Sequence, residues 1–229
     1  SGTTTYANAH VKLSAPSGAI DLTGEPYGGS FDASAATAKD KHRNVVGWVP
    51  MGTRGNPFAG TFTAKGTDIE RFHIPGRNNP GLFECGSNAT LSDVTIASGY
   101  FNHTGGVAGG SLMAYATGDV TMTDCRNAAE GHGAGSGAYL GGLMGRSQGG
   151  SVTMSRCMNQ GDLQTENNNA AGLLADFSSD AGGKLSVSDC GNTGAQAAYA
   201  GVAGLVVDMK TNSSDAGALS IVNSYNFGP

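Results

Sequence analysis

The chain has 229 residues, of which 38 are glycine, and only 14% are charged. Globular proteins average about 7% glycine, so more than twice the usual amount needs a structural cause. Collagen is excluded because there is no Gly-X-Y period and only 7 prolines. A content of 38% hydrophobic residues is too high for a disordered chain. The net charge of -5, from 13 basic and 18 acidic residues, argues against a nucleic-acid partner.

The first 47 residues precede the clearest repeats. They contain two short segments with the alternating pattern of strands, at 11–13 and 19–22. We expect residues 1–47 to form an N-terminal cap or first coil, and 48–229 to form repeats of the same structural domain. No apolar run approaches the ~18 residues of a membrane span, and no signal-peptide pattern is present. Because the chain starts at Ser1, we expect it to be a segment of a larger polypeptide.

Two motifs recur in step along the rest of the chain. The segments VTMTDCRN, VTMSRCMN, LSVSDCGN and LSIVNSYN begin at residues 120, 152, 185 and 219, at offsets of 32, 33 and 34. A second register follows glycine-rich turns, whose leucines lie 30, 31, 30 and 32 residues apart. These leucines are Leu82, Leu112, Leu143, Leu173 and Leu205. Repetition at this period indicates a solenoid.

The repeats favour strands over helices. Each contains short segments of β-type alternation separated by Gly, Asn, Asp and Ser, with no sustained helical period. The predicted fold is an all-β parallel β-helix with about five recognisable coils, whose neighbouring strands lie ~4.8 Å apart. Glycine then serves corners that need positive φ and places where opposite walls pack closely. The expected inward stacks are Val120, Val152, Leu185 and Leu219, and Met122, Met154, Val187 and Ile221.

Two ladders follow from the same alignment. The first consists of Cys125, Cys157, Cys190 and Ser224, and the second of Asn127, Asn159, Asn192 and Asn226. Strand spacing permits a disulfide between neighbouring cysteines, but in-register side chains point the same way and one rung is a serine. We therefore predict free, buried thiols. The stacked asparagine amides are expected to hydrogen-bond along the axis and to tolerate left-handed backbone.

Charged residues also occur in register. The position before the cysteine carries Asp124, Arg156, Asp189 and Asn223, which places opposite charges on successive coils. A second position carries Arg146, Asp176 and Asp208. The sequence predicts that Arg146 pairs with Asp176, and that Asp176 and Asp208 form either a weak calcium site or a solvated turn. No other metal and no organic cofactor is predicted.

The region from Trp48 to Phe83 carries a resemblance to a known family. It reads Trp-Val-Pro-Met-Gly at 48–52, Pro-Phe-Ala-Gly-Thr-Phe at 57–62 and Gly-Leu-Phe at 81–83. With the later Gly-Leu turns, this order resembles bacterial GLUG-repeat proteins over about residues 45–229. The segments Thr-Ala-Lys-Gly at 63–66 and Gly-Ser-Leu at 110–112 depart from the pattern.

The resemblance implies a right-handed parallel β-helix from a secreted or cell-surface bacterial protein, adhesin-like and often one module of a longer chain. Similar repeats accompany IgA-cleaving metalloproteases. That activity does not carry over, because the chain lacks a His-Glu-x-x-His motif.

Two functions remain open at this stage. The first is a noncatalytic module that binds a host protein or glycan through its side walls or turn loops, without nucleic acid and without direct membrane insertion. The second is a carbohydrate-active β-helix, such as a polysaccharide lyase, a glycoside hydrolase or a phage tailspike-like protein. Glycoside hydrolysis needs two carboxylates on a groove. The candidates occupy repeated positions typical of structural ladders, so no catalytic residue is predicted; they are Asp93, Asp124, Asp176, Asp189 and Asp208.

Surface features outside the ladders give weaker signals. The longest irregular insertions, 130–137 and 164–169, carry few acidic and basic groups. Tyrosines at 100, 115, 139 and 199 either offer stacking surfaces for sugars or pack in the core and turns. A side groove lined by carboxylates and aromatics that do not recur with the repeat would favour the carbohydrate-active function. Walls of uniform ladders would favour the noncatalytic module.

Overall fold

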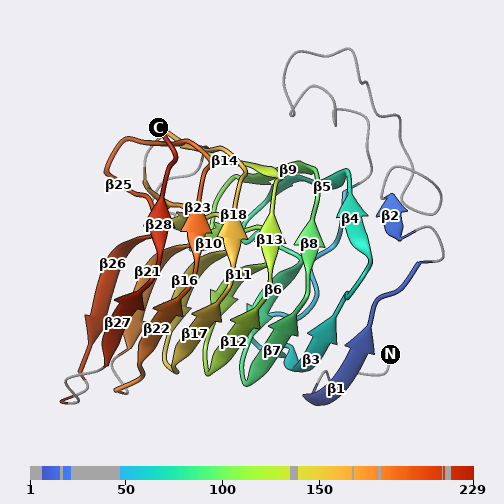
Figure 1. Cartoon of the computed structure of the whole chain (residues 1–229), viewed down its shortest axis with the longest axis horizontal. Helices are drawn as coiled ribbons and strands as arrows, with labels where there is room; N and C mark the ends of the chain where they lie inside the picture. The colour runs from blue at the N-terminus through green and yellow to red at the C-terminus, as the bar shows by residue number, and fades with distance from the viewer. Residues whose placement is uncertain are drawn as a thin grey trace.

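The computed structural model describes residues 7–15, 18–21, 47–134, 139–166, 168–179, 182–212, 214 and 218–229. Within these ranges the chain forms strands, bridges and turns and contains no helix. All paired strands between coils are parallel, and they stack into a β-solenoid of about five turns (Figure 1). The predicted all-β parallel β-helix is thus confirmed.

Each complete coil passes in chain order through five sheets, which we number 1 to 5. The first two meet at the corner that precedes the repeated cysteine. Sheet 1 contains β1 (Ala7–Lys12), β3 (Ala59–Thr63), β7 (Ala89–Ser92), β12 (Val120–Thr123), β17 (Val152–Ser155), β22 (Leu185–Ser188) and β27 (Leu219–Val222). Sheet 2 contains β2 (Ala19–Asp21), β4 (Asp68–Glu70), β8 (Thr95–Ile96), β13 (Arg126–Asn127), β18 (Met158–Asn159), β23 (Gly191–Asn192) and β28 (Tyr225–Asn226).

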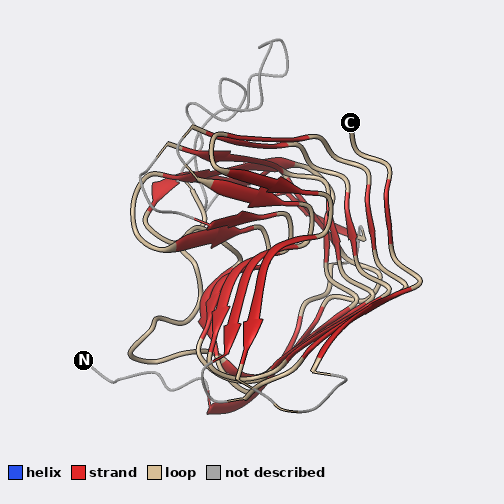
Figure 2. Ribbon diagram, turned by 90° about the vertical axis from the view of Figure 1, so that its left-hand side faces the viewer, coloured by secondary structure: helices blue, strands red, loops and turns tan. Residues whose placement is uncertain are grey.

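The remaining sheets complete the coil. Sheet 3 contains β5 (Phe72–Arg77), β9 (Gly99–His103), β14 (Glu130–Gly133), β19 (Leu163–Thr165) and β24 (Gln196–Ala198). Sheet 4 contains β10 (Ala108–Gly110), β15 (Tyr139–Gly141), β20 (Asn169–Ala171) and β25 (Gly201–Ala203). Sheet 5 contains β6 (Phe83–Gly86), β11 (Met113–Ala116), β16 (Met144–Gln148), β21 (Leu174–Ser179) and β26 (Val206–Thr211). Viewed along the stack, the successive coils superpose around one interior (Figure 2).

The interior of sheet 1 contains both predicted apolar stacks. Strand pairing aligns Val120 with Val152, Leu185 and Leu219, and it aligns the stack of Met122 in the same way. The side chains of these two stacks in β12, β17 and β22 are buried and belong to one continuous core. Leu219 and Ile221 are about 40% and 38% exposed, because β27 is the outermost strand of sheet 1 among the described residues.

The glycine-leucine register forms the corner between sheets 4 and 5. Its leucines stack, and the amide of Leu143 donates to the carbonyl of Leu173 at 3.1 Å. A Cβ on Gly142 would lie 2.1 Å from the carbonyl oxygen of Gly172. Only glycine fits there, so the close packing predicted for this register is confirmed.

The corner between sheets 1 and 2 corrects a second expectation about glycine. The left-handed residue here is not glycine, and it is not the ladder asparagine. It is the residue before the repeated cysteine, with φ between 48° and 55° at Asp93, Asp124, Arg156, Asp189 and Asn223. Asp and Asn tolerate this conformation because their short polar side chains bond locally, whereas Arg156 adopts it at a cost of about 1 kcal/mol.

The described part of residues 1–47 lies against the first repeats. Strand β1 pairs with β3, and β2 pairs with β4. Residues 1–6, 16–17 and 22–46 lie outside the described ranges, as does part of the 19–22 segment. The Trp-x-Pro-x-Gly segment covers the leucine stack, since the Trp48 indole Nε1 donates to the carbonyl of Leu82 at 3.1 Å.

Candidate functional site

A groove of about 410 Å³ lies on the outer face of sheet 3. We call it the sheet 3 groove. Its walls come from four neighbouring coils, and the side chains that project from the β9, β14, β19 and β24 segments differ in chemistry from one coil to the next. The lining residues are Tyr100, Glu130, Gly131, His132, Asp162, Leu163, Gln164, Ala195 and Ala197.

One column of the groove carries an aromatic ring and two carboxylates. Tyr100 is paired with Glu130 across β9 and β14, and Asp162 occupies the corresponding place on the next coil. The Tyr100 ring is only 5% exposed and stacks on His73 with centroids 6.3 Å apart. Glu130 and Asp162 are exposed. The Asp162 carboxylate accepts the amide of Ala195 at 2.8 Å, which holds its orientation.

The second column supplies hydrogen-bonding groups of both kinds. Asn102, His132 and Gln164 lie side by side on successive strands. His132 Nδ1 is 3.4 Å from Asn102 Oδ1, and His132 Nε2 is 3.9 Å from a carboxylate oxygen of Glu166. The two columns thus place carboxylate, amide and imidazole groups around one shallow depression. Such groups can bind the hydroxyls of a sugar, and the nearly buried Tyr100 lines the depression.

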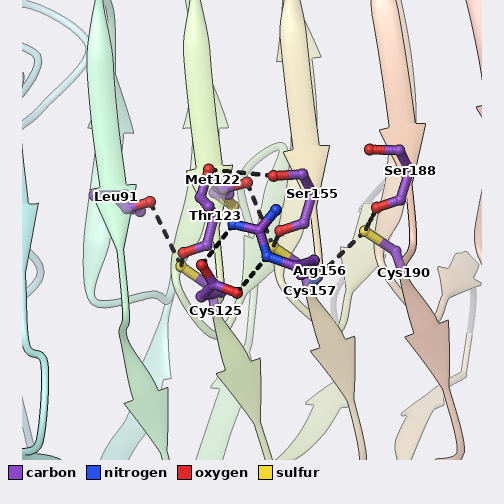
Figure 3. Close-up of polar contacts among 10 residues, drawn as sticks. Leu91, Met122, Thr123, Cys125, Ser155, Arg156, Cys157, Ser188 and Cys190 are labelled. Carbon is purple, nitrogen blue, oxygen red and sulfur yellow. Dashed lines mark hydrogen bonds and ion pairs between the residues drawn. The ribbon is translucent and has the colours of Figure 1, made fainter.

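The cysteine ladder lies inside the solenoid and has no access to this groove. All four cysteines are free and buried. Cys125, Cys157 and Cys190 line up at the corner after sheet 1 (Figure 3), and the Cys157 amide donates to Cys190 Sγ at 3.3 Å. The Cys190 amide donates to Ser224 Oγ at 3.1 Å, which completes the predicted fourth rung. The Cys157–Cys125 hydrogen bond, with burial, raises the pKa of Cys157 to about 12.

The asparagine ladder forms the predicted chain of amide hydrogen bonds. Each amide nitrogen donates to the side-chain oxygen of the next asparagine, at 2.8 Å from Asn127 to Asn159, 2.8 Å to Asn192 and 2.6 Å to Asn226. Each also donates to the carbonyl two residues ahead, for example Asn159 to Gly161 at 2.8 Å. The first three side chains are fully buried, so these bonds satisfy groups that water cannot reach.

The two predicted charge pairs form, one at the corner between sheets 1 and 2 and one within sheet 5. Arg156 donates twice to the Asp124 carboxylate, at 2.7 and 2.8 Å, on the surface. Arg146 Nε lies 2.6 Å from Asp176 Oδ2, and the Asp176 side chain is only 3% exposed. Burial raises the pKa of Asp176, the positive charge of Arg146 lowers it, and the neighbouring Asp208 raises it again.

The calcium candidates already have partners. Asp176 is paired with Arg146, while Asp208 accepts from the Asn169 amide at 3.1 Å. Among the described residues, no three His, Cys, Asp or Glu side chains gather where they could hold a metal ion. Asp93, Asp124 and Asp189 lie at the left-handed corners between sheets 1 and 2 and do not line the sheet 3 groove.

Comparison with known proteins adds no relative. No family model, no curated protein and no solved structure matches the chain. In the part of the chain that the structure describes, no helix is long and apolar enough to span a membrane.

The groove residues were not nominated from the sequence, apart from the listing of Tyr100 among tyrosines that either stack on sugars or pack. Glu130 and Gln164 open the two irregular insertions, of which 135–138 and 167 lie outside the described residues. The missed signal is positional. Counting from the repeated cysteine places Glu130 and Asp162 five residues after Cys125 and Cys157, a position that is alanine after Cys190.

Proposed function

We propose that the chain is a noncatalytic, adhesin-like binding module of a secreted or cell-surface bacterial protein, and that it binds a glycan in the sheet 3 groove. The observation that carries the proposal is the contrast within one wall. The backbone repeats from coil to coil, but the groove side chains change to tyrosine, carboxylate, imidazole and amide. The resemblance to GLUG-repeat proteins supports the same class and cellular location.

Binding rather than catalysis is favoured by the exposure of the two carboxylates. A general acid in a glycosidase needs an environment that keeps it protonated. Glu130 and Asp162 are both exposed, and Asp162 is engaged by the amide of Ala195. Rigid groups that already point outward can bind sugar hydroxyls with little ordering cost.

Glycan-array binding of the whole chain tests this function. The wild-type chain is expected to bind a defined set of glycans. Glu130→Gln is expected to weaken that binding about tenfold, the effect of losing a charge-assisted hydrogen bond. Thr153→Tyr, an exposed position on sheet 1, is the matched control and should bind normally. Absence of binding to any glycan, or equal loss in both variants, would contradict the proposal.

A carbohydrate-active enzyme is the second candidate, and one observation favours it. Glu130 and Asp162 stand on neighbouring strands, which are ~4.8 Å apart in a sheet, and retaining glycosidases hold their carboxyl groups roughly 5 Å apart. Incubation with a polysaccharide panel separates the two functions. Release of reducing ends or unsaturated products, lost in Glu130→Gln and Asp162→Asn, would replace the noncatalytic assignment.

A further inference from the structure

The outer face of sheet 1 carries a regular array of hydroxyl groups, which we call the hydroxyl face. Strand pairing from β3 to β27 places the outward residues in two columns that run along the solenoid. The columns are Thr61, Thr90, Thr121, Thr153, Ser186 and Ser220, and Thr63, Ser92, Thr123, Ser155, Ser188 and Val222. Eleven of these twelve positions are therefore threonine or serine.

The array is two-dimensional and evenly spaced. Its strands lie side by side in one direction across the front of the molecule (Figure 1). Neighbouring strands are ~4.8 Å apart, and alternate residues along one strand are about 6.6 Å apart. The columns are close enough in places for direct contact, since Ser155 Oγ donates to Thr123 Oγ1 at 3.3 Å. The buried stacks of Met122 and Val120 hold the face from behind.

Strand propensity does not account for this composition. Threonine favours strands, but serine is not among the strong strand formers, and five serines occupy the face. The outward columns of sheet 3 show that the fold accepts Tyr100, Glu130 and His132 at comparable positions. From β3 to β27 the two columns carry no charged side chain, and on β1 they continue as His10 and Lys12. The Asp124–Arg156 pair lies at a flanking corner.

A rigid lattice of small hydroxyl and methyl groups can hold a layer of ordered water without losing side-chain entropy. The spacing of neighbouring strands, ~4.8 Å, is close to the shorter repeat of the oxygen lattice in hexagonal ice. The two columns contain no aromatic ring, so the face lacks the large apolar contact area that such rings supply. We propose that the hydroxyl face binds ice. This activity is independent of the glycan-binding function of sheet 3.

The test is thermal hysteresis and inhibition of ice recrystallisation by the whole chain. The wild-type chain is expected to show both. Thr153→Tyr and Thr90→Tyr each place a bulky ring at an exposed position of the array and are expected to abolish both. Gln164→Tyr makes the same change at an exposed position of sheet 3 and should leave both intact.

Circular dichroism and thermal melting show whether each of the three variants is folded. If one array variant misfolds, the other, on a different coil, still provides the test. A wild-type chain without hysteresis or recrystallisation inhibition would overturn the proposal. So would full activity in both array variants, or an equal loss in Gln164→Tyr. Glycan binding by Thr153→Tyr is unaffected in either case, so failure of one proposal is distinguishable from failure of the other.

Discussion

The outer faces of sheets 1 and 3 differ although the same coils build both. On sheet 1 the outward side chains repeat, as threonine or serine, from β3 almost to β27. On sheet 3 the corresponding column changes from Tyr100 to Glu130, Asp162 and Ala195. Behind sheet 1 the inward residues are apolar and stacked, whereas behind sheet 3 the apolar Phe101 and Leu163 lie beside a column that holds His103 and Thr165.

The difference shows which positions the solenoid itself constrains. Most inward residues fill one continuous apolar core, and the buried polar side chains, such as Asn127, His103 and Thr165, are the exceptions. Outward residues face water and do not have to fill the core. The repetition of one residue type along sheet 1 and the variation along sheet 3 therefore indicate that the two surfaces have different functions. The uniform wall fits a repeating lattice, whereas the varied wall fits a ligand of defined shape.

Changes in the interior should disturb both walls together. Asn159→Ala removes an amide that bonds Asn127, Asn192 and the carbonyl of Gly161. The unpaired buried groups should lower the free energy of unfolding by about 4 kcal/mol. Denaturant unfolding measures this loss. Asn102 on sheet 3 is partly exposed, so Asn102→Ala should lower the free energy of unfolding far less. A similar loss in both variants would mean that a ladder asparagine contributes no more to stability than a surface asparagine.

The Arg146–Asp176 pair lies within sheet 5, which belongs to neither wall, so its loss should affect stability alone. Arg146→Ala leaves the Asp176 carboxylate buried without its ion pair. We expect a loss of about 3 kcal/mol in the free energy of unfolding. Adding Asp176→Asn should recover part of that loss, because it removes the unpaired charge. Absence of recovery in the double variant would show that Arg146 contributes through packing instead.

Acid should lower the free energy of unfolding through protonation of His103, which lies in sheet 3. This side chain is fully buried at the end of β9, and burial lowers its pKa from 6.5 to about 4. The unfolded chain therefore binds the proton at a higher pH than the folded chain does. Stability should fall as pH drops from about 6.5 towards 4, by about 3 kcal/mol in total. Unfolding of His103→Leu should lack this component; an unchanged pH profile would contradict the assignment.

A count of reactive thiols should distinguish free, buried cysteines from cysteines joined in a disulfide. We expect four reactive thiols in denaturant and none in the native chain, because all four cysteines are free and buried. The raised pKa of Cys157, about 12, also keeps that group protonated near neutral pH. Titration with a thiol reagent measures both states, and fewer than four thiols in denaturant would indicate a disulfide.

The smallest effect is expected at the edge of the hydroxyl face. Arg156→Ala removes the surface pair with Asp124 and should leave the melting temperature almost unchanged, since exposed ion pairs contribute little and are screened by salt. Melting temperatures of both chains at low and high salt measure this contribution. Arg156→Gly, which relieves the left-handed φ of 52°, should melt no lower than Arg156→Ala; the opposite order would show that the arginine stem packs on the corner.

The order of residues was sufficient to predict the coil and its register. Equivalent positions recur every 30 to 34 residues, and in a parallel solenoid such positions must become neighbours. The apolar stacks, the cysteine and asparagine ladders and the Asp124–Arg156 and Arg146–Asp176 pairs follow from that single relation. Each concerns residues that share one position of the repeat, so their contacts need no knowledge of the coil's cross-section.

The cross-section itself came only from the tertiary structure. The left-handed corner at Asp124 and the close approach that requires Gly142 determine where each coil bends. Register alone places Tyr100, Glu130 and Asp162 in one column. That this column and the one of His132 face outward around a groove came from the tertiary structure, because the bends decide which face of a short strand points away from the core. Periodicity relates one coil to the next; the path within a coil depends on backbone geometry that periodicity does not encode.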